Sequence, residues 1–188
     1  METFMEARSF VDDRFYERRR EDTLRELYRL IDSRDIDRPL LNLMRKCTCI
    51  PYWFTLQCCY GHFMHESRKN QGGLDSPSSL HDLVGPITYQ IAYLAVCIQN
   101  NGSGRKLFGD LQSIRDIDLE YVQFGSAQWF WDRCVNSYVL QVEPEADRSR
   151  DTAWVHYEEA LYLEKVRNQF YENIEKVVDA HLLPIRTE

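Results

Sequence analysis

The sequence contains no uninterrupted apolar run of the roughly 18 to 20 residues that a membrane span requires. Its first twenty residues mix charges of both signs and hold no apolar stretch of the kind found in secretory signals. We therefore expect a soluble protein of the cytoplasm. Thiols stay reduced in that compartment, so we expect the six cysteines to be free rather than paired in disulfides.

An excess of positive charge is also lacking. The formal net charge is −7, and residues 143–188 carry 6 basic and 11 acidic side chains. Proteins that hold long stretches of nucleic acid usually present a basic face, because phosphate contacts dominate that affinity. The charge balance argues against extended nucleic-acid binding and leaves a local basic patch open.

Several catalytic signatures are missing as well. The chain shows no internal repeat, Walker loop, dinucleotide fingerprint or catalytic-triad spacing. Methyl transfer needs none of these, because the positioning of a bound donor against a nucleophilic nitrogen supplies most of the rate. The missing signatures therefore do not exclude a methyltransferase.

The length and the hydrophobic content of 44% are typical of a single globular domain over residues 1–188. Residues 10–48 are predicted to be helical, and residues 52–142 to form a mixed centre with buried strands. Apolar positions recur at helical spacing over residues 153–182, which predicts a long C-terminal helix. Residues 66–81 are predicted to be a loop. We predict an α+β fold in which a small mixed or antiparallel sheet packs against helices.

The centre of the chain is rich in cysteine and histidine. Thiolate and imidazole suit zinc, which makes Cys58, Cys59, His62 and His65 candidate ligands. On a strand, however, neighbouring side chains point to opposite faces, so one ion does not easily collect all four. A reactive thiol and simple packing of buried cysteines stay open as alternatives.

The same alternation predicts a second grouping. Thr55, Gln57, Cys59, Gly61 and Phe63 would share one face of the strand. A glycine in such a strand allows a ligand to approach the backbone closely.

One stretch resembles a known family. LRELYRLIDSRDIDRPLLNLMRKCTCIPYWFTLQCCYGHF is similar to the opening of the tRNA wybutosine-synthesising methyltransferases that act third in that pathway. The family signature YFTTSSCSGR falls on residues 53–62, where Phe54, Thr55, Cys59 and Gly61 agree. ITYQIAYLAVC resembles the family's FILHVA strand, with Gln90 in place of the histidine, and the C-terminal helix resembles its closing helix. The resemblance implies a fold and a pocket that bind S-adenosylmethionine and a modified nucleoside or tRNA.

The signature also departs from the family. Gln57, Cys58 and Tyr60 stand where the family has serines, and His62 replaces its arginine. Arginine is always charged and grips a carboxylate or phosphate through two parallel hydrogen bonds, which histidine cannot reproduce. A noncatalytic ligand-binding or regulatory module on the same fold therefore stays open beside the methyltransferase.

A further candidate is the glycine turn at residues 102–104. It precedes two cations at a predicted helix start, where free N–H groups and positive charge suit an anion. An ordinary capped turn without a ligand stays open as the alternative. The residues that we expect to bind cofactor or substrate are Thr55, Gln57, Cys59, Gly61, His62, Gln90, Arg105 and Lys106.

Overall fold

The computed structural model describes residues 4–65, 76–80, 85–144 and 151–182. Its helices are α1 (Tyr16–Ser33), α2 (Leu41–Thr48), α3 (Gly102–Gln112), α4 (Gln128–Arg133) and α5 (Tyr157–Leu182). Short 3-10 helices cover Arg38–Leu40, Pro77–Leu80 and Ser113–Ile117. The strands are β1 (Phe4–Met5), β2 (Trp53–Cys59), β3 (His62–Met64), β4 (Ile87–Gln90), β5 (Ala92–Ile98), β6 (Val122–Ala127), β7 (Ser137–Val142) and β8 (Thr152–Val155).

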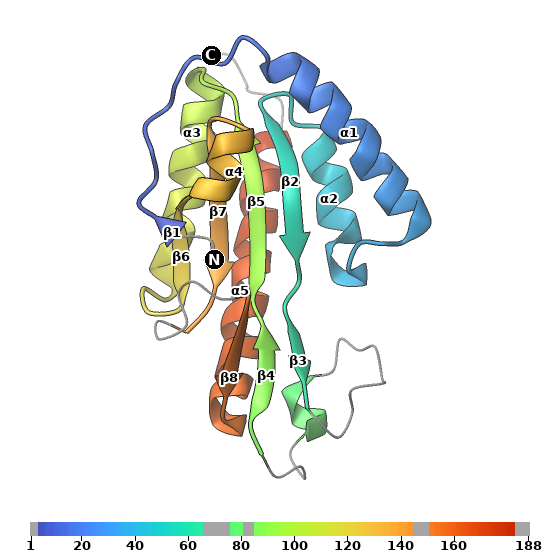
Figure 1. Ribbon diagram of the computed structural model, residues 1–188, viewed down its shortest axis with the longest axis vertical. Coiled ribbons are helices and arrows are strands. Elements are labelled where there is room, and N and C mark those ends of the chain that lie inside the picture. The colour runs from blue at the N-terminus through green and yellow to red at the C-terminus, as the bar shows by residue number, and fades with distance from the viewer. Residues whose placement is uncertain (1–3, 66–75, 81–84, 145–150, 183–188) are drawn as a thin grey trace.

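The strands form two antiparallel sheets, and two pairs of consecutive strands run from one sheet into the other. A five-stranded sheet has the order β1-β6-β7-β5-β2, and a three-stranded sheet has the order β3-β4-β8. β2 continues into β3 through Tyr60 and Gly61, and β4 continues into β5 through Ile91, so the two sheets follow one another in space (Figure 1). β2 is an edge strand of the larger sheet, and its free edge faces α1.

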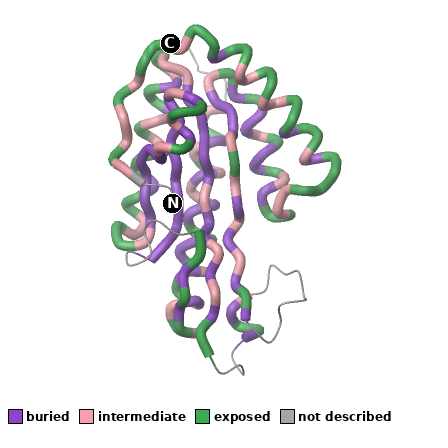
Figure 2. Tube along the Cα trace, viewed as in Figure 1, coloured by how far each residue is buried: buried purple, intermediate pink, exposed green. Residues whose placement is uncertain are grey.

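Helix α5 lies behind both sheets and supplies much of the core (Figure 1). Its apolar residues recur every three or four positions, so they form one stripe that packs against the strands. Each valine, leucine, isoleucine or phenylalanine side chain of this stripe contributes about 1.5 to 3 kcal/mol when it is fully buried. Figure 2 shows the buried residues concentrated on the strands and on the inner faces of the helices. The buried apolar stripe of α5 consists of Ala160, Leu163, Val166, Phe170, Ile174 and Val178.

The predicted α+β class and the long C-terminal helix are confirmed. The helix begins at Tyr157, however, and residues 152–155 form β8 beside β4. Within β8 the side chains of Ala153 and Val155 are buried while Thr152 and Trp154 are exposed, which is the period of a strand rather than of a helix. The predicted loop at residues 66–81 lies mostly outside the described residues. No helix of the described part is long and apolar enough to cross a membrane.

Candidate functional site

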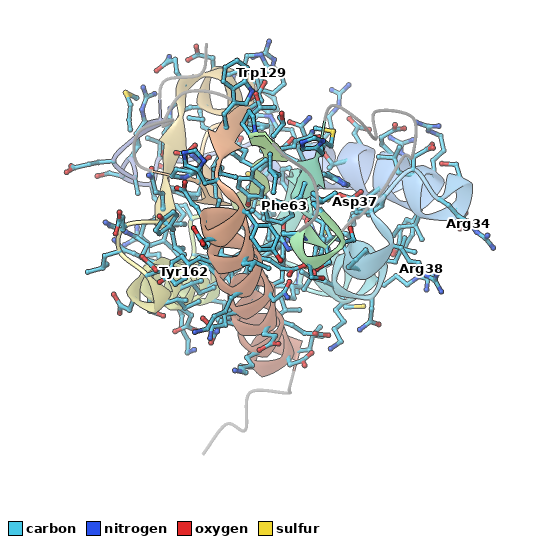
Figure 3. All side chains as sticks on the ribbon, turned by 90° about the horizontal axis from the view of Figure 1, so that it is seen from below. Arg34, Asp37, Arg38, Phe63, Trp129 and Tyr162 are labelled. Carbon is cyan, nitrogen blue, oxygen red and sulfur yellow. The ribbon has the colours of Figure 1, made fainter. Side chains whose placement is uncertain are left out.

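A cleft of about 340 Å³ lies beside the free edge of β2. This volume falls at the lower end of the roughly 300 to 1,000 Å³ that small-molecule sites occupy. Leu27 and Leu30 of α1 form one wall of the cleft. Asp37 lies at one end of the cleft, between α1 and the strands (Figure 3). β2, β3 and the strands next to them form the other wall. The residues of this wall that the sequence predicted as binding residues are Thr55, Gln57, Cys59, His62 and Gln90.

Three chemically different side chains meet at one end of the cleft. Asp37 Oδ2 accepts a hydrogen bond of 2.7 Å from the Tyr60 N–H and lies 3.2 Å from His62 Nε2. The thiol of Cys59 joins them, so that one ligand atom from each of the three residues lies within 4.8 Å of the other two. Cys59 is buried, whereas Asp37 and His62 are partly exposed to the cleft.

The surroundings of this cluster favour charged forms of its acid and base. Hydrogen bonds to Asp37 and Cys59 raise the pKa of His62 to about 10, against the opposing effect of burial. Burial alone would raise the pKa of Asp37, but the hydrogen bonds from His62 and from the Tyr60 backbone outweigh it, and the pKa is lowered. Asp37 and His62 therefore form an ion pair at neutral pH.

The turn between β2 and β3 is fixed by Gly61 and by two side chains of α5. Gly61 has a φ of 90°, and a Cβ atom there would lie 2.8 Å from the Cβ of Ala92. Its carbonyl accepts a hydrogen bond of 3.0 Å from the buried guanidinium of Arg167. The Tyr171 hydroxyl donates to the carbonyl of Cys59. Cys59 and His62 are thus presented by a rigid turn, and Gly61 allows close packing of Ala92 rather than approach of a ligand.

A β-bulge changes how β2 presents its side chains. Thr55 pairs with Val96, but Gln57 pairs with Ala95, the next residue along β5. Because adjacent residues of β5 point to opposite faces, Thr55 and Gln57 also lie on opposite faces, contrary to the predicted alternation. Both still line the cleft, because it opens at the edge of the strand.

Arg105 and Lys106 lie away from this cleft. Helix α3 begins at Gly102, capped by the Asn101 side chain, and the Arg105 guanidinium donates two hydrogen bonds to Asn100. Lys106 is paired with Asp110 at 2.6 Å. Arg105 lines a separate cavity of about 690 Å³ together with Arg8 and Arg115, while Lys106 lines neither of these two cavities. The predicted anion contacts therefore do not join the other candidate residues.

The four zinc candidates are likewise separated. Cys59 and His62 belong to the cluster with Asp37, whereas Cys58 and His65 are not part of it. Burial raises the pKa of the Cys58 thiol to about 12. All six cysteines are free thiols.

The comparisons with known proteins concern the fold alone. No protein-family model and no curated protein matches the chain. Among solved structures, the PH1069 protein from Pyrococcus horikoshii OT3 is similar, with a TM-score of 0.48 and 15% identity over 90% of this chain and 92% of that one. A second structure of PH1069 from Pyrococcus horikoshii has the same TM-score and identity over 89% and 93%. Neither similarity bears on what the cleft binds.

Charge in the cleft is predominantly negative. Glu26, Asp35 and Asp37 line it, and His62 is the cation among the lining residues that the structure describes. Glu26 is also paired with Arg29 on the exposed side of α1. Carboxylates that outnumber cations favour a positively charged or neutral polar ligand over a phosphate.

Three residues of the site were not predicted as site residues. Asp37 was not among the predicted binding residues, and its carboxylate accepts a hydrogen bond from the Tyr60 N–H. Arg167 and Tyr171 were part of a helical pattern that carried no sign of their contacts with the turn.

Proposed function

We propose that this chain is a methyltransferase-like protein, related to the tRNA wybutosine-synthesising enzymes, that binds S-adenosylmethionine in the cleft beside β2. The observation that carries the proposal is that two separate motifs named by the resemblance meet there. His62 belongs to the first motif and Gln90 to the second, and the two are directly paired across β3 and β4. Both line the cleft with Thr55, Gln57 and Cys59.

The chemistry of the lining supports this ligand. S-adenosylmethionine carries a sulfonium and an ammonium group, which are favoured near carboxylates such as Asp35 and Asp37. The apolar wall formed by Leu27 and Leu30 suits the adenine ring, since pockets of this kind combine apolar surface with a few polar groups. The amides of Gln57 and Gln90 supply donors and acceptors for the ribose or the amino-acid part.

The acceptor in this proposal is a modified nucleoside of tRNA in the cytoplasm. The described residues that line the acidic cleft include no lysine or arginine to bind a run of phosphates, so a single nucleoside would enter it. The second candidate is a noncatalytic module that binds the same ligands. It is favoured by one observation, namely that His62, which stands where the resembling family has an arginine, is already hydrogen-bonded to Asp37.

Calorimetry with S-adenosylmethionine tests binding. At about 100 μM protein, a dissociation constant of ~10 μM gives a clear signal. Gln57→Ala removes a hydrogen-bonding group worth about 0.5 to 1.5 kcal/mol, so we expect binding about 2- to 10-fold weaker. Lys106→Ala is the matched control outside the cleft and leaves the affinity unchanged. The absence of heat with the unaltered chain contradicts the proposal.

Transfer of a labelled methyl group distinguishes the two candidates. The chain is incubated with labelled S-adenosylmethionine and tRNA that carries the immature wybutosine precursor. Incorporation of label into tRNA supports the methyltransferase. Calorimetric binding without incorporation supports the noncatalytic module.

A further inference from the structure

Asp37, Cys59 and His62 lie at separations close to those of ligands around one metal ion. Zinc bonds of about 2.0 to 2.2 Å to oxygen and nitrogen place two tetrahedral ligands roughly 3.3 to 3.5 Å apart. The distance from Asp37 Oδ2 to His62 Nε2 is 3.2 Å. The Cys59 sulfur lies within 4.8 Å of a carboxylate oxygen of Asp37 and of a ring nitrogen of His62, so a small side-chain movement brings it to the roughly 3.5 Å that a tetrahedral site needs.

The sequence spacing and backbone also fit a metal site. Cys59 and His62 are separated by two residues, as paired ligands are in zinc knuckles. Gly61 provides the positive φ of the tight turn between them. Asp37 reaches the same point from the loop before α2, and the Tyr60 N–H orients its carboxylate.

We infer that these three residues bind one Zn²⁺ ion. A thiolate ligand argues against Mg²⁺ and Ca²⁺, which prefer oxygen, while a sulfur, nitrogen and oxygen set suits Zn²⁺. The thiolate and the carboxylate together neutralise the ion, so the half-buried site gains no net charge. On binding, the Cys59 thiol and the protonated His62 ring each lose one proton to solvent, and the Cys59 sulfur and the His62 Nε2 each donate a lone pair to the ion.

Groups around the ligands hold them in place before a metal arrives. Arg167 binds the Gly61 carbonyl and Tyr171 binds the Cys59 carbonyl, so both ligand-bearing ends of the turn are fixed to α5. Such supporting contacts raise metal affinity by limiting the motion of the ligands. All three ligands line the cleft. Three protein ligands with a fourth position open to a cleft are typical of catalytic rather than structural zinc sites, and the fourth position would take water or a donor atom of a bound molecule.

Cobalt substitution tests the site directly. The chain is stripped with a chelator and titrated with Co²⁺, and then Zn²⁺ is used to displace the cobalt. We expect one equivalent to bind, with the intense visible bands of tetrahedral Co²⁺ and a thiolate-to-cobalt charge-transfer band. Weak octahedral bands without a thiolate band in the folded, unaltered chain overturn the inference, and this readout requires no variant.

Matched variants identify the ligands. Cys59→Ser and His62→Gln should each weaken Zn²⁺ binding by more than the roughly 10- to 100-fold that loss of a supporting contact costs. Cys58→Ser removes the neighbouring thiol outside the cluster and Cys49→Ser removes the exposed thiol, and both should leave the affinity unchanged. Binding that survives Cys59→Ser, or is lost with Cys49→Ser, overturns the inference. The site does not depend on the proposed function, and calorimetry with S-adenosylmethionine in the presence of a chelator tests that function separately.

Discussion

Among single residues, Gly61 carries the tightest steric constraint in the candidate site. Gly61→Ala would introduce a Cβ atom 2.8 Å from that of Ala92 at a φ of 90°, which L-residues with side chains rarely adopt. We expect the free energy of unfolding to fall by about 1 to 3 kcal/mol. Urea unfolding monitored by circular dichroism measures the change.

Gly109 provides the matched control. It lies on the exposed side of α3, and an added Cβ atom would meet nothing within 4 Å. Gly109→Ala should stabilise the chain by about 0.5 to 1 kcal/mol, because alanine is the better helix former. Equal effects of the two substitutions would show that the Gly61 turn is not constrained.

The ion pair of His62 and Asp37 makes stability depend on pH in the metal-free chain. The pKa of His62 rises from its ordinary value of 6.5 to about 10 in the folded chain. Between these values the folded state binds more protons than the unfolded state, so the free energy of unfolding decreases as pH rises. The contribution is fully present below about pH 6.5 and is lost toward pH 10. Asp37 stays ionised throughout, because its pKa is lowered.

This dependence is measured by urea unfolding of the unaltered chain and of His62→Gln, both with a chelator present. The stability difference between the two should be largest near pH 6 and shrink steadily toward pH 10. A difference that is constant over this range would mean that His62 is not charged in the folded state.

At the scale of elements, α5 links the core to the site. The buried hydroxyl of Tyr171 binds the backbone carbonyl of Cys59 and lies 3.2 Å from the backbone carbonyl of Tyr93. Tyr171→Phe would leave both carbonyls without this donor, at a cost of about 1 to 3 kcal/mol. Thermal or urea unfolding measures the loss.

Tyr162→Phe is the corresponding control on the same helix. Tyr162 is exposed, and its hydroxyl binds only Asp118 among the hydrogen bonds described (Figure 3). Removal of this hydroxyl should change stability by no more than about 0.5 kcal/mol. If the two substitutions lower the free energy of unfolding equally, the contact of Tyr171 with the turn does not stabilise the chain more than an exposed hydroxyl does.

How well an element could be predicted depended on its length. α5 has 26 residues and shows several turns of its pattern, so its position was predicted to within a few residues. β8 has four residues and β1 has two, which is too short for a period to be recognised. The bulge in β2 arises from pairing with β5, and no local pattern in Thr55 to Gln57 indicates it.

At the scale of the whole molecule, the site depends on contacts between distant parts of the chain. Five of the eight predicted binding residues line one cleft, because Thr55, Gln57, Cys59 and His62 are close together along the chain and Gln90 pairs with His62 across β3 and β4. The role of Asp37 was missed because its carboxylate meets His62 only after α1, α2 and the sheet have packed. Arg105 was predicted to bind an anion only from the residues next to it in the sequence. In the structure its guanidinium donates a hydrogen bond to Asn100.

The negative charge of the molecule predicts that its affinity for a cationic ligand depends on salt. The chain carries a formal net charge of −7, and carboxylates outnumber cations in the cleft. S-adenosylmethionine has one net positive charge and S-adenosylhomocysteine has none. The Debye screening length falls from about 10 Å at 0.1 M salt to about 3 Å at 1 M, so added salt weakens the attraction between the cleft and a cation. We expect calorimetry to show S-adenosylmethionine binding less tightly at high salt, with little change for S-adenosylhomocysteine. The same salt dependence for both compounds would mean that the acidic groups do not contact the sulfonium.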